Sequence, residues 1–263
     1  MVSHYGCYLI QMRMVKKKTI SLSENLENFK MFPKHKTRAI ILSKEDRGEY
    51  DRLLTLYTKE FGKIVLFCKS IRKESSKLRF GAEPMLLIDV EFIEGKSFKT
   101  LTDIVIVNSY ANIAKDIKKI SLAGKIAQDL SDLIKGEEKD WEVWKIIEQS
   151  FNNLNNTDND FITYQYFFWR LIDTLGYGPE LYSCVKCGKN VNYNKIPFSL
   201  EIGGILCDNC AKTENYFTIS VESLKMLRLI LAKDFDFLTR VKISHKDEEF
   251  LWVASGEYLN SLN

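Results

Sequence analysis

The pattern of apolar and polar residues divides the chain into a β-rich part followed by a helical part. Between residues 34 and 110, short apolar stretches such as residues 37–43 alternate with turn residues, which is typical of β-strands. Turns at Lys59–Lys63, with Gly62 as the pivot, and at Gly95–Lys96 predict two hairpins. Strands this short and numerous predict a small closed barrel, because closure removes the exposed edges of the sheet. We favour an OB-type barrel and keep an SH3-like barrel as the alternative, since periodicity does not separate them.

After Tyr110 the apolar residues recur at the three- and four-residue spacing of amphipathic helices. Residues 111–134 and 140–154 predict two helices, whose apolar positions include Ile113, Ile117, Ile120, Ala123, Ile126, Ala127 and Leu130 in the first and Trp141, Trp144, Ile147 and Phe151 in the second. Residues 160–177 are so rich in large apolar side chains that they predict a central helix buried on nearly all sides, ending at Gly176. Residues 221–234, capped by Ser220, and residues 248–262 predict two more helices that pack on this bundle.

Two Cys-x-x-Cys pairs interrupt the helical part. Cys184 and Cys187 form the first pair, Cys207 and Cys210 the second, and Gly188 gives the first turn its conformational freedom. Four thiolates suit a tetrahedral Zn²⁺, and a site with all four ligands from protein has no open position for catalysis. We therefore predict a structural zinc ion that contributes to folding. Iron fits the same four sulfurs, and two disulfides are the less favoured alternative.

Length and charge refine this organisation. A chain of 263 residues with 45% hydrophobic content supports more than one domain. We predict a disordered extension (1–33), a barrel (34–110), a helical domain (111–180 and 218–263) and an inserted zinc-ribbon-like subdomain (181–217). This is an α+β multidomain fold class. No apolar run reaches the ~18 residues needed to span a bilayer, and the cysteine usage favours a reducing cytoplasm. We also hypothesise that translation starts at Met31, which the intact mass of the native protein would test.

The net charge of +3 conceals a marked asymmetry along the chain. Residues 34–82 carry 13 lysines or arginines against six acidic residues, a balance of +7. Five of these cations lie between the two predicted hairpins, on a segment too irregular for a strand. Such a loop can place cations along a phosphate backbone without reading bases, so binding would be salt-sensitive and largely independent of sequence. Phe61, Phe67 and Phe80 are available for base stacking, although core packing is the favoured role for each.

The order of these features resembles a known family. A basic small barrel, a helical domain, the sequence LGYGPEL and then CVKC and CDNC are similar to the RecO family of bacterial recombinational-repair mediators. RAIILSKEDRGEYDRLLTLYTKEFGKI and KSIRKESSKLRFGAEPMLLIDVEF also resemble the N-terminal domain of that family. The resemblance covers residues 34–260, and it leaves residues 1–33 outside the pattern.

The resemblance implies a non-catalytic function in DNA repair and homologous recombination. Members of the RecO family bind single- and double-stranded DNA, anneal complementary strands and, with RecR, help RecA replace the single-stranded-DNA-binding protein. They also bind the acidic, apolar-ended C-terminal tail of that protein, for which Lys125 or Arg170 beside a helical groove are candidates here. A cytoplasmic, nucleoid-associated location follows, without a membrane partner. The predicted DNA-binding residues are Lys36, Arg38, Arg47, Arg52, Lys63, Lys69, Arg72, Lys73, Lys77 and Arg79.

Two other classes of function remain as alternatives. A zinc-dependent nuclease or hydrolase needs an open metal position and a nearby base, but His4, His35 and His245 all lie far from the cysteines in sequence. The chain also lacks the G-x-x-x-x-G-K-[ST] nucleotide-binding motif. A zinc-ribbon adaptor that binds only protein is the second alternative, and the absence of DNA affinity would identify it.

Overall fold

The computed structural model describes residues 33–262. Except for Pro33, the predicted disordered extension and the start hypothesis at Met31 lie outside these residues. The described residues from Lys34 onward form one compact unit. Within the described part of the chain, no helix combines the length and the apolar character needed to cross a membrane.

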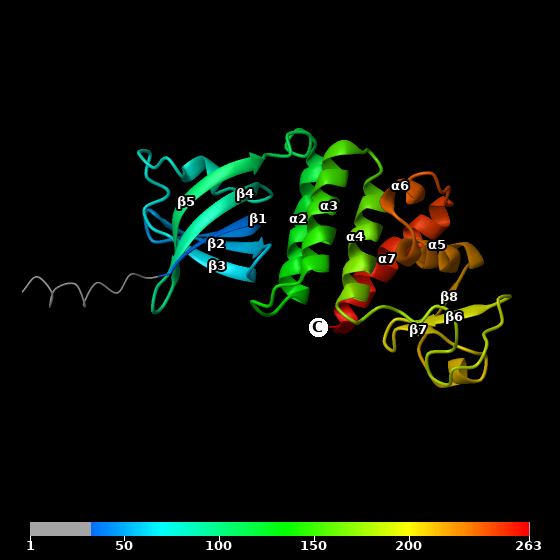
Figure 1. The fold of residues 1–263 in the computed structure, drawn as a ribbon. Helices are drawn as coiled ribbons and strands as arrows, with labels where there is room; N and C mark the ends of the chain where they lie inside the picture. Colours follow the sequence, from blue (N-terminus) through cyan, green and yellow to red (C-terminus); the bar gives the residue numbers. More distant parts are fainter. Residues whose placement is uncertain (1–32, 263) are drawn as a thin grey trace, which may run out of the picture. The chain divides into compact units, whose positions relative to one another are not determined.

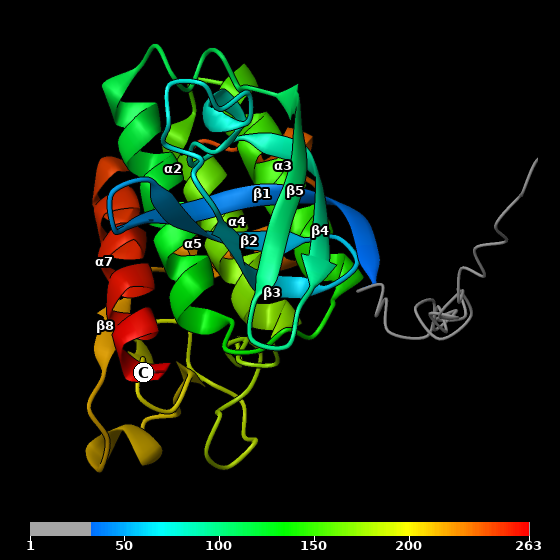
Figure 2. The ribbon, with the colours of Figure 1, turned by 90° about the vertical axis from the view of Figure 1, so that its left-hand side faces the viewer.

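Five strands form the predicted barrel: β1 (Lys34–Arg47), β2 (Asp51–Thr58), β3 (Gly62–Cys68), β4 (Leu87–Glu94) and β5 (Lys99–Asn108). They close in the order β1-β2-β3-β5-β4, as Figure 1 and Figure 2 show. All neighbours are antiparallel except β3 and β5, which run parallel and pair over two residue positions only. This Greek-key order confirms the OB-type barrel over the SH3-like alternative.

Strand β1 is buried on both faces. Ala39 and Ile41 point into the barrel, whereas Ile40 and Leu42 point outward and join the core of the helical region. Successive side chains of a strand point to opposite faces, so the continuous apolar run of residues 39–42 supplies two cores at once. Tyr57 on β2 is buried on the same outward side.

β1 also extends beyond its predicted end. Lys44–Arg47 pair with Asp51–Leu54 of β2, and Gly48, with φ of +55°, forms the turn between them. The residues of this hairpin tip are mostly charged and exposed, so they carry no apolar alternation from which a strand is predicted. The cross-strand hydrogen bonds of the ladder nevertheless continue through them.

The helices are α2 (Ile117–Leu133), α3 (Trp141–Asn156), α4 (Asp160–Thr174), α5 (Val221–Ala232), α6 (Phe235–Leu238) and α7 (His245–Leu262). Their N-terminal amides are capped by side chains, including that of Ser220 as predicted. Helix α4 contacts α2, α3, α5, α6 and α7 and is the buried centre of the bundle, which confirms its predicted place (Figure 1). The four-residue helix α6 is too short to have left a periodic signal.

Two apolar residues that were predicted to lie on buried helix faces, one aliphatic and one aromatic, are instead exposed. Ile117 is 77% exposed and Trp141 is 50% exposed. Each is the first residue of its helix, α2 or α3, and the rest of each apolar stripe packs as expected. The ring of Trp141 lies beneath two ammonium groups, those of Lys59 at 4.7 Å and Lys145 at 5.6 Å.

The cysteine-containing region forms a small sheet of β7 (Gly204–Ile205), β6 (Ile196–Ser199) and β8 (Phe217–Ile219), in that order. A short 3₁₀ turn, η2 (Cys210–Lys212), follows the second cysteine pair. The apolar side chains of this region belong to the same core cluster as the helices. On the helical side, Tyr258 of α7 donates a hydrogen bond to the carbonyl of Tyr177, just beyond α4, at 2.8 Å.

The barrel meets the α2–α3 connection at the turn of Gly62, so we expect a substitution there to affect stability. Gly62 has φ of +65°, and a Cβ there would lie 2.3 Å from the carbonyl oxygen of Glu138. Gly48 has a similar φ but open space around it. We expect Gly48→Ala to lower the free energy of unfolding by about 1–2 kcal/mol through backbone strain alone. Gly62→Ala should cost at least about 1 kcal/mol more, because backbone must also move.

Chemical denaturation of both variants measures this difference. Equal destabilisation would contradict the close approach of the α2–α3 connection to the barrel.

Candidate nucleic-acid interface and metal centre

The four predicted ligands come together in space. The sulfurs of Cys184, Cys187, Cys207 and Cys210 all lie within 4.8 Å of one another, and those of Cys187 and Cys207 are 3.7 Å apart. Four thiolates around a tetrahedral Zn²⁺ with Zn–S bonds of about 2.3 Å are separated by about 3.8 Å. Disulfides would join the sulfurs in pairs at about 2.05 Å, and the five described cysteines are all free thiols.

Each cysteine pair is shaped by its own backbone. The amide of Gly188 donates to the carbonyl of Cys184 at 2.8 Å, and Gly188 adopts the positive φ predicted for this turn. The amide of Ala211 donates to the carbonyl of Cys207 at 3.0 Å in the second turn. These turns point both sulfurs of a pair toward the same place, as a shared ion requires.

Two of the four thiols, Cys184 and Cys207, have a lowered pKa, whereas a hydrogen bond with Cys187 raises the pKa of Cys210 to about 12. Burial disfavours the Cys184 thiolate, but hydrogen bonds from backbone amides outweigh it and lower the pKa of Cys184 to about 6. The pKa of Cys207 is lowered as well, chiefly by a backbone hydrogen bond. Thiolates are the form that binds metal, so the backbone supports ligation near neutral pH. The donor set fits a closed structural ion and leaves no protein position open for chemistry.

The predicted DNA-binding residues fall into distinct environments. Lys69, Arg72, Lys73, Lys77 and Arg79 lie together on the β3–β4 loop. Arg72 is engaged within the protein, because its guanidinium donates a hydrogen bond to the carbonyl of Gly48 at 3.3 Å and forms an ion pair with Asp46 at 3.3 Å. The other four form no ion pair within 4.0 Å among the described residues. We call these four, Lys69, Lys73, Lys77 and Arg79, the free loop cations.

The remaining predicted residues are mostly engaged within the protein. Arg52 has a side chain only 10% exposed and binds Asp46, Glu83 and the carbonyl of Ala82. Lys63 donates to the carbonyl of Ser131 on α2 at 2.8 Å. The ion pairs of the other three are Lys36 with Glu91, Arg38 with Asp89 and Arg47 with Glu45.

The pairing of Arg38 with Asp89 shifts the pKa of both groups. Their hydrogen bond lowers the pKa of Asp89 and raises that of Arg38. A cation that already has its carboxylate is a weaker attractor of phosphate, so the β1–β4 face contributes less to a polyanion site than its composition suggests.

The hairpin tip of β1 and β2 lies beside the β3–β4 loop and adds residues that the sequence did not single out. Together they line a polar cleft of about 960 Å³. Lys44 lies on its wall and pairs with Glu83. Tyr50 lies there too, with the ammonium of Lys73 5.2 Å from its ring centre. These residues were missed because the hairpin tip was not predicted as a strand.

The three phenylalanines predicted as core residues do not behave alike. Phe61 packs against the barrel core and lies 5.4 Å from the ring of Phe92. Phe67 is partly buried beside Phe98 at 5.8 Å. Phe80, on the 3₁₀ turn η1 (Arg79–Gly81), is 78% exposed. Core packing is therefore wrong for Phe80.

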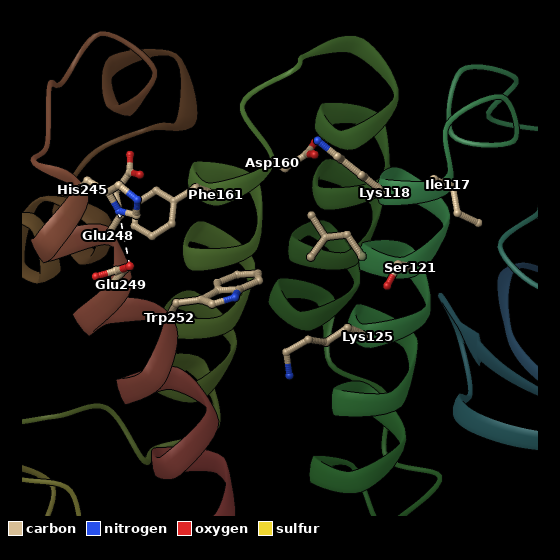
Figure 3. A pocket seen from close by; sticks show the side chains of 11 residues that line it. Ile117, Lys118, Ser121, Lys125, Asp160, Phe161, His245, Glu248, Glu249 and Trp252 are labelled. Atoms are coloured by element: carbon tan, nitrogen blue, oxygen red, sulfur yellow. Dashed lines mark ion pairs between the residues drawn. The ribbon is translucent and has the colours of Figure 1, made fainter.

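A second candidate site lies in the helical region, where α2, α4 and α7 border a pocket of about 610 Å³ (Figure 3). Ile117, Leu122, Phe161 and Trp252 give it an apolar lining. Figure 3 shows Lys125 on α2 at one end and Glu248 and Glu249 on α7 at the other. The sequence indicated only Lys125 among these residues, because Ile117 fits the apolar stripe of α2 and was predicted to be a core residue.

Lys125 and Arg170, the two candidates for binding the acidic tail, lie in different environments. Lys125 lines this pocket, with its ammonium 3.3 Å from Asp129 and 4.9 Å from the ring centre of Tyr164. Asp129 is buried and accepts from the hydroxyl of Tyr164 at 2.9 Å, and burial raises its pKa. Arg170 donates to the carbonyl of Leu231 and does not line this pocket.

The structure combines an OB-type barrel with a cationic loop, a helical bundle and a four-cysteine centre. Comparisons with known proteins specify the family. A family model described as recombination protein O N terminal matches residues 31–110, and one described as recombination protein O C terminal matches residues 114–261. The chain belongs to the RecO family.

Named relatives agree with this assignment. DNA repair protein RecO of Dehalococcoides mccartyi is 32% identical over 80% of this chain and 83% of its own length. The proteins of the same name from Heliobacterium modesticaldum and a Thermoanaerobacter species are 30% and 29% identical, over 81% and 80% of this chain and 79% and 84% of their own lengths.

We predict that the cysteine centre stabilises the fold through bound zinc. Cys187 is an exposed ligand, so Cys187→Ser removes one thiolate with little loss of packing. The variant should lose its metal and melt about 5 °C lower or more, because metal binding contributes to folding. Elemental analysis and thermal melting, with and without a chelator, measure both effects.

Lys189→Ala, at an exposed position of the same turn, is the matched control and should keep metal and melting temperature. A wild-type protein that is purified without metal and melts unchanged in chelator would contradict a structural ion. Iron in the elemental analysis would replace zinc as the occupant.

Proposed function

We propose that this protein is a recombination mediator that binds single- and double-stranded DNA on its barrel and anneals complementary strands. With RecR it would help load RecA onto single strands coated by the single-stranded-DNA-binding protein. It would act in the cytoplasm at the nucleoid, with Zn²⁺ as a structural ion. The observation that carries the proposal is the set of free loop cations on an OB-type barrel in a chain of this family.

The charges support binding to the phosphate backbone. Within residues 33–262, Lys69, Lys73, Lys77 and Arg79 have no carboxylate partner to displace, so contact with phosphate breaks no ion pair there. Each phosphate that a cation neutralises releases condensed counterions, which favours binding at low salt. Such contacts carry no base information, which suits a protein that acts on any sequence.

Annealing requires no nucleotide hydrolysis. A cationic surface that holds two strands reduces their mutual repulsion and raises their local concentration. Base pairing then supplies the free energy of the reaction. The protein acts as a cationic surface for the two anionic strands and takes no part in bond formation.

We further propose that the pocket of α2, α4 and α7 binds the C-terminal tail of the single-stranded-DNA-binding protein. An apolar terminal side chain suits the surface of Ile117, Phe161 and Trp252. The ammonium of Lys125, whose side chain is 38% exposed and which is shared with Asp129, lies where a terminal carboxylate would end. Lys118 on the same helix is available to the acidic residues upstream. Glu248 and Glu249 border the far side of the pocket. They would repel an acidic tail bound in the opposite direction, with its terminal carboxylate away from Lys125.

We predict that removing the free loop cations weakens DNA binding and its salt dependence. Alanine at Lys69, Lys73, Lys77 and Arg79 leaves the engaged Arg52 and Arg72 in place, so the barrel should stay folded. The slope of log affinity against log salt for single strands should fall by about 2–3, because each lost phosphate contact removes about 0.7. Fluorescence anisotropy with a labelled oligonucleotide between 50 and 200 mM salt, as the titration range, measures it.

The matched control removes the same charge elsewhere, at exposed Lys189, Lys225, Lys242 and Lys246. Both variants have the same net charge, so only the position of the cations differs. An equal loss of affinity in the two would show that the loop has no special part. An absence of DNA binding by the wild type would favour the adaptor alternative.

We predict that the pocket binds an acidic peptide with a free apolar C-terminal residue. Lys125→Ala and Ile117→Ala should each weaken binding about fivefold or more, through loss of the carboxylate partner and of apolar contact respectively. Fluorescence of Trp252, which lines the pocket and is partly exposed, provides the signal.

Val253→Ala, at the exposed neighbour of Trp252, is the apolar control and should bind like the wild type. C-terminal amidation of the peptide should weaken binding to the wild type but have little further effect on Lys125→Ala. A peptide that binds equally with and without its carboxylate would contradict the role of Lys125.

A further inference from the structure

Phe80 is a large aromatic residue that the fold holds in solvent. It is 78% exposed, although Gly81 and Ala82 immediately after it are buried. Exposure of a single large apolar side chain is common, so this fact alone decides nothing. What distinguishes Phe80 is how firmly its backbone is held and what surrounds it.

The turn that carries Phe80 is seated on β5. A Cβ at Gly81 would lie 2.3 Å from the Cγ2 atom of Ile104 and 3.8 Å from the Cγ1 atom of Ile106, so only glycine permits this approach. The amides of Gly81 and Ala82 donate to the carbonyls of Leu78 and Arg79 at 3.2 and 3.3 Å. Phe80 is therefore presented from a closely packed turn.

Apolar surface continues from this turn onto the strand. Ile106 lies beside Gly81 and is 44% exposed. Pairing of β5 with β3 covers only Lys99 and Thr100 of β5, so this part of the strand lies beyond the parallel contact. Phe80 and Ile106 are thus two exposed apolar residues next to Gly81, the first adjacent to it in the chain and the second across from it on β5.

Two cations precede Phe80 on the same loop. Arg79 directly precedes Phe80, Lys77 lies two residues further back, and neither forms an ion pair within 4.0 Å among the described residues. Arg79 also lines the polar cleft of the hairpin tip. An exposed ring beside unpaired cations is the combination that proteins use for single-stranded nucleic acid, with bases on the ring and phosphates on the cations.

We propose that Phe80 is a stacking platform for an unpaired DNA base and gives the barrel its preference for single strands. This inference rests on the proposed DNA-binding function and adds a base-contacting residue to it. In a duplex each base is already stacked and paired, so only its backbone reaches the loop cations. In a single strand a base is free to lie on the ring of Phe80, with Ile106 covering part of its edge.

The test compares affinities of Phe80→Ala for a single-stranded and a double-stranded oligonucleotide of equal length. Affinity for the single strand should fall about fivefold or more, because stacking of one base on an aromatic residue contributes that much. Affinity for the duplex and the salt slope of both should stay unchanged, since no phosphate contact is lost. Phe80→Trp should keep the wild-type preference.

Phe98→Ala is the matched control, because Phe98 is 63% exposed and lies in the β4–β5 turn of the same barrel. It should leave the ratio of the two affinities unchanged. An oligonucleotide of abasic sites should bind wild type and Phe80→Ala equally, since it offers phosphates without bases.

Several results would overturn the inference. They are an unchanged single-strand affinity in Phe80→Ala, an equal loss for single strand and duplex, or a change of oligomeric state that identifies Phe80 as a protein contact. If the wild type binds neither oligonucleotide, the proposed function itself fails. If it binds both and Phe80→Ala binds like it, only the stacking role fails.

Discussion

The burial of β1 on both faces is the constraint on which the rest of the structure depends. Ala39 and Ile41 hold the barrel interior, while Ile40 and Leu42 attach the barrel to the helical core. A fully buried aliphatic side chain contributes about 1.5–3 kcal/mol, so neither face is dispensable in a protein of ordinary stability. The strand thereby commits one side of the barrel to the helices, so the proposed DNA contact is confined to the remaining surface.

On that remaining surface, ion pairing separates structural cations from available ones. Arg52 and Arg38 form ion pairs with carboxylates of neighbouring strands or loops, so their charge is already neutralised within the barrel. The loop between β3 and β4 carries cations that have no such partner, on backbone fixed by the close contact of Gly81 with β5. The same barrel therefore has a paired face that maintains its shape and an unpaired edge that is free to bind a polyanion. The helical region contributes a separate apolar pocket with its own lysine.

The sequence predicted much of this because its signals were local. The glycine pivot at Gly62, the cap at Ser220 and the spacing of the cysteine pairs each reflect a short-range rule, and each was confirmed. The failures come from long-range packing. Ile117 belongs to an apolar stripe, yet its side chain at the start of α2 is 77% exposed. Phe80 has the apolar character of a core residue, yet it is exposed on a turn that Gly81 seats against β5. The residues predicted to contact DNA share a charge, and sequence gives no means to tell which of them already have carboxylate partners.

The most direct test of the account is the rate at which two complementary labelled strands anneal when both are precoated with the single-stranded-DNA-binding protein. We expect the wild-type chain to accelerate annealing and the variant lacking the free loop cations to do so far less, although this variant is folded and retains its metal. Equal rates with and without the folded, metal-loaded protein would contradict the account and point to an adaptor that binds only protein.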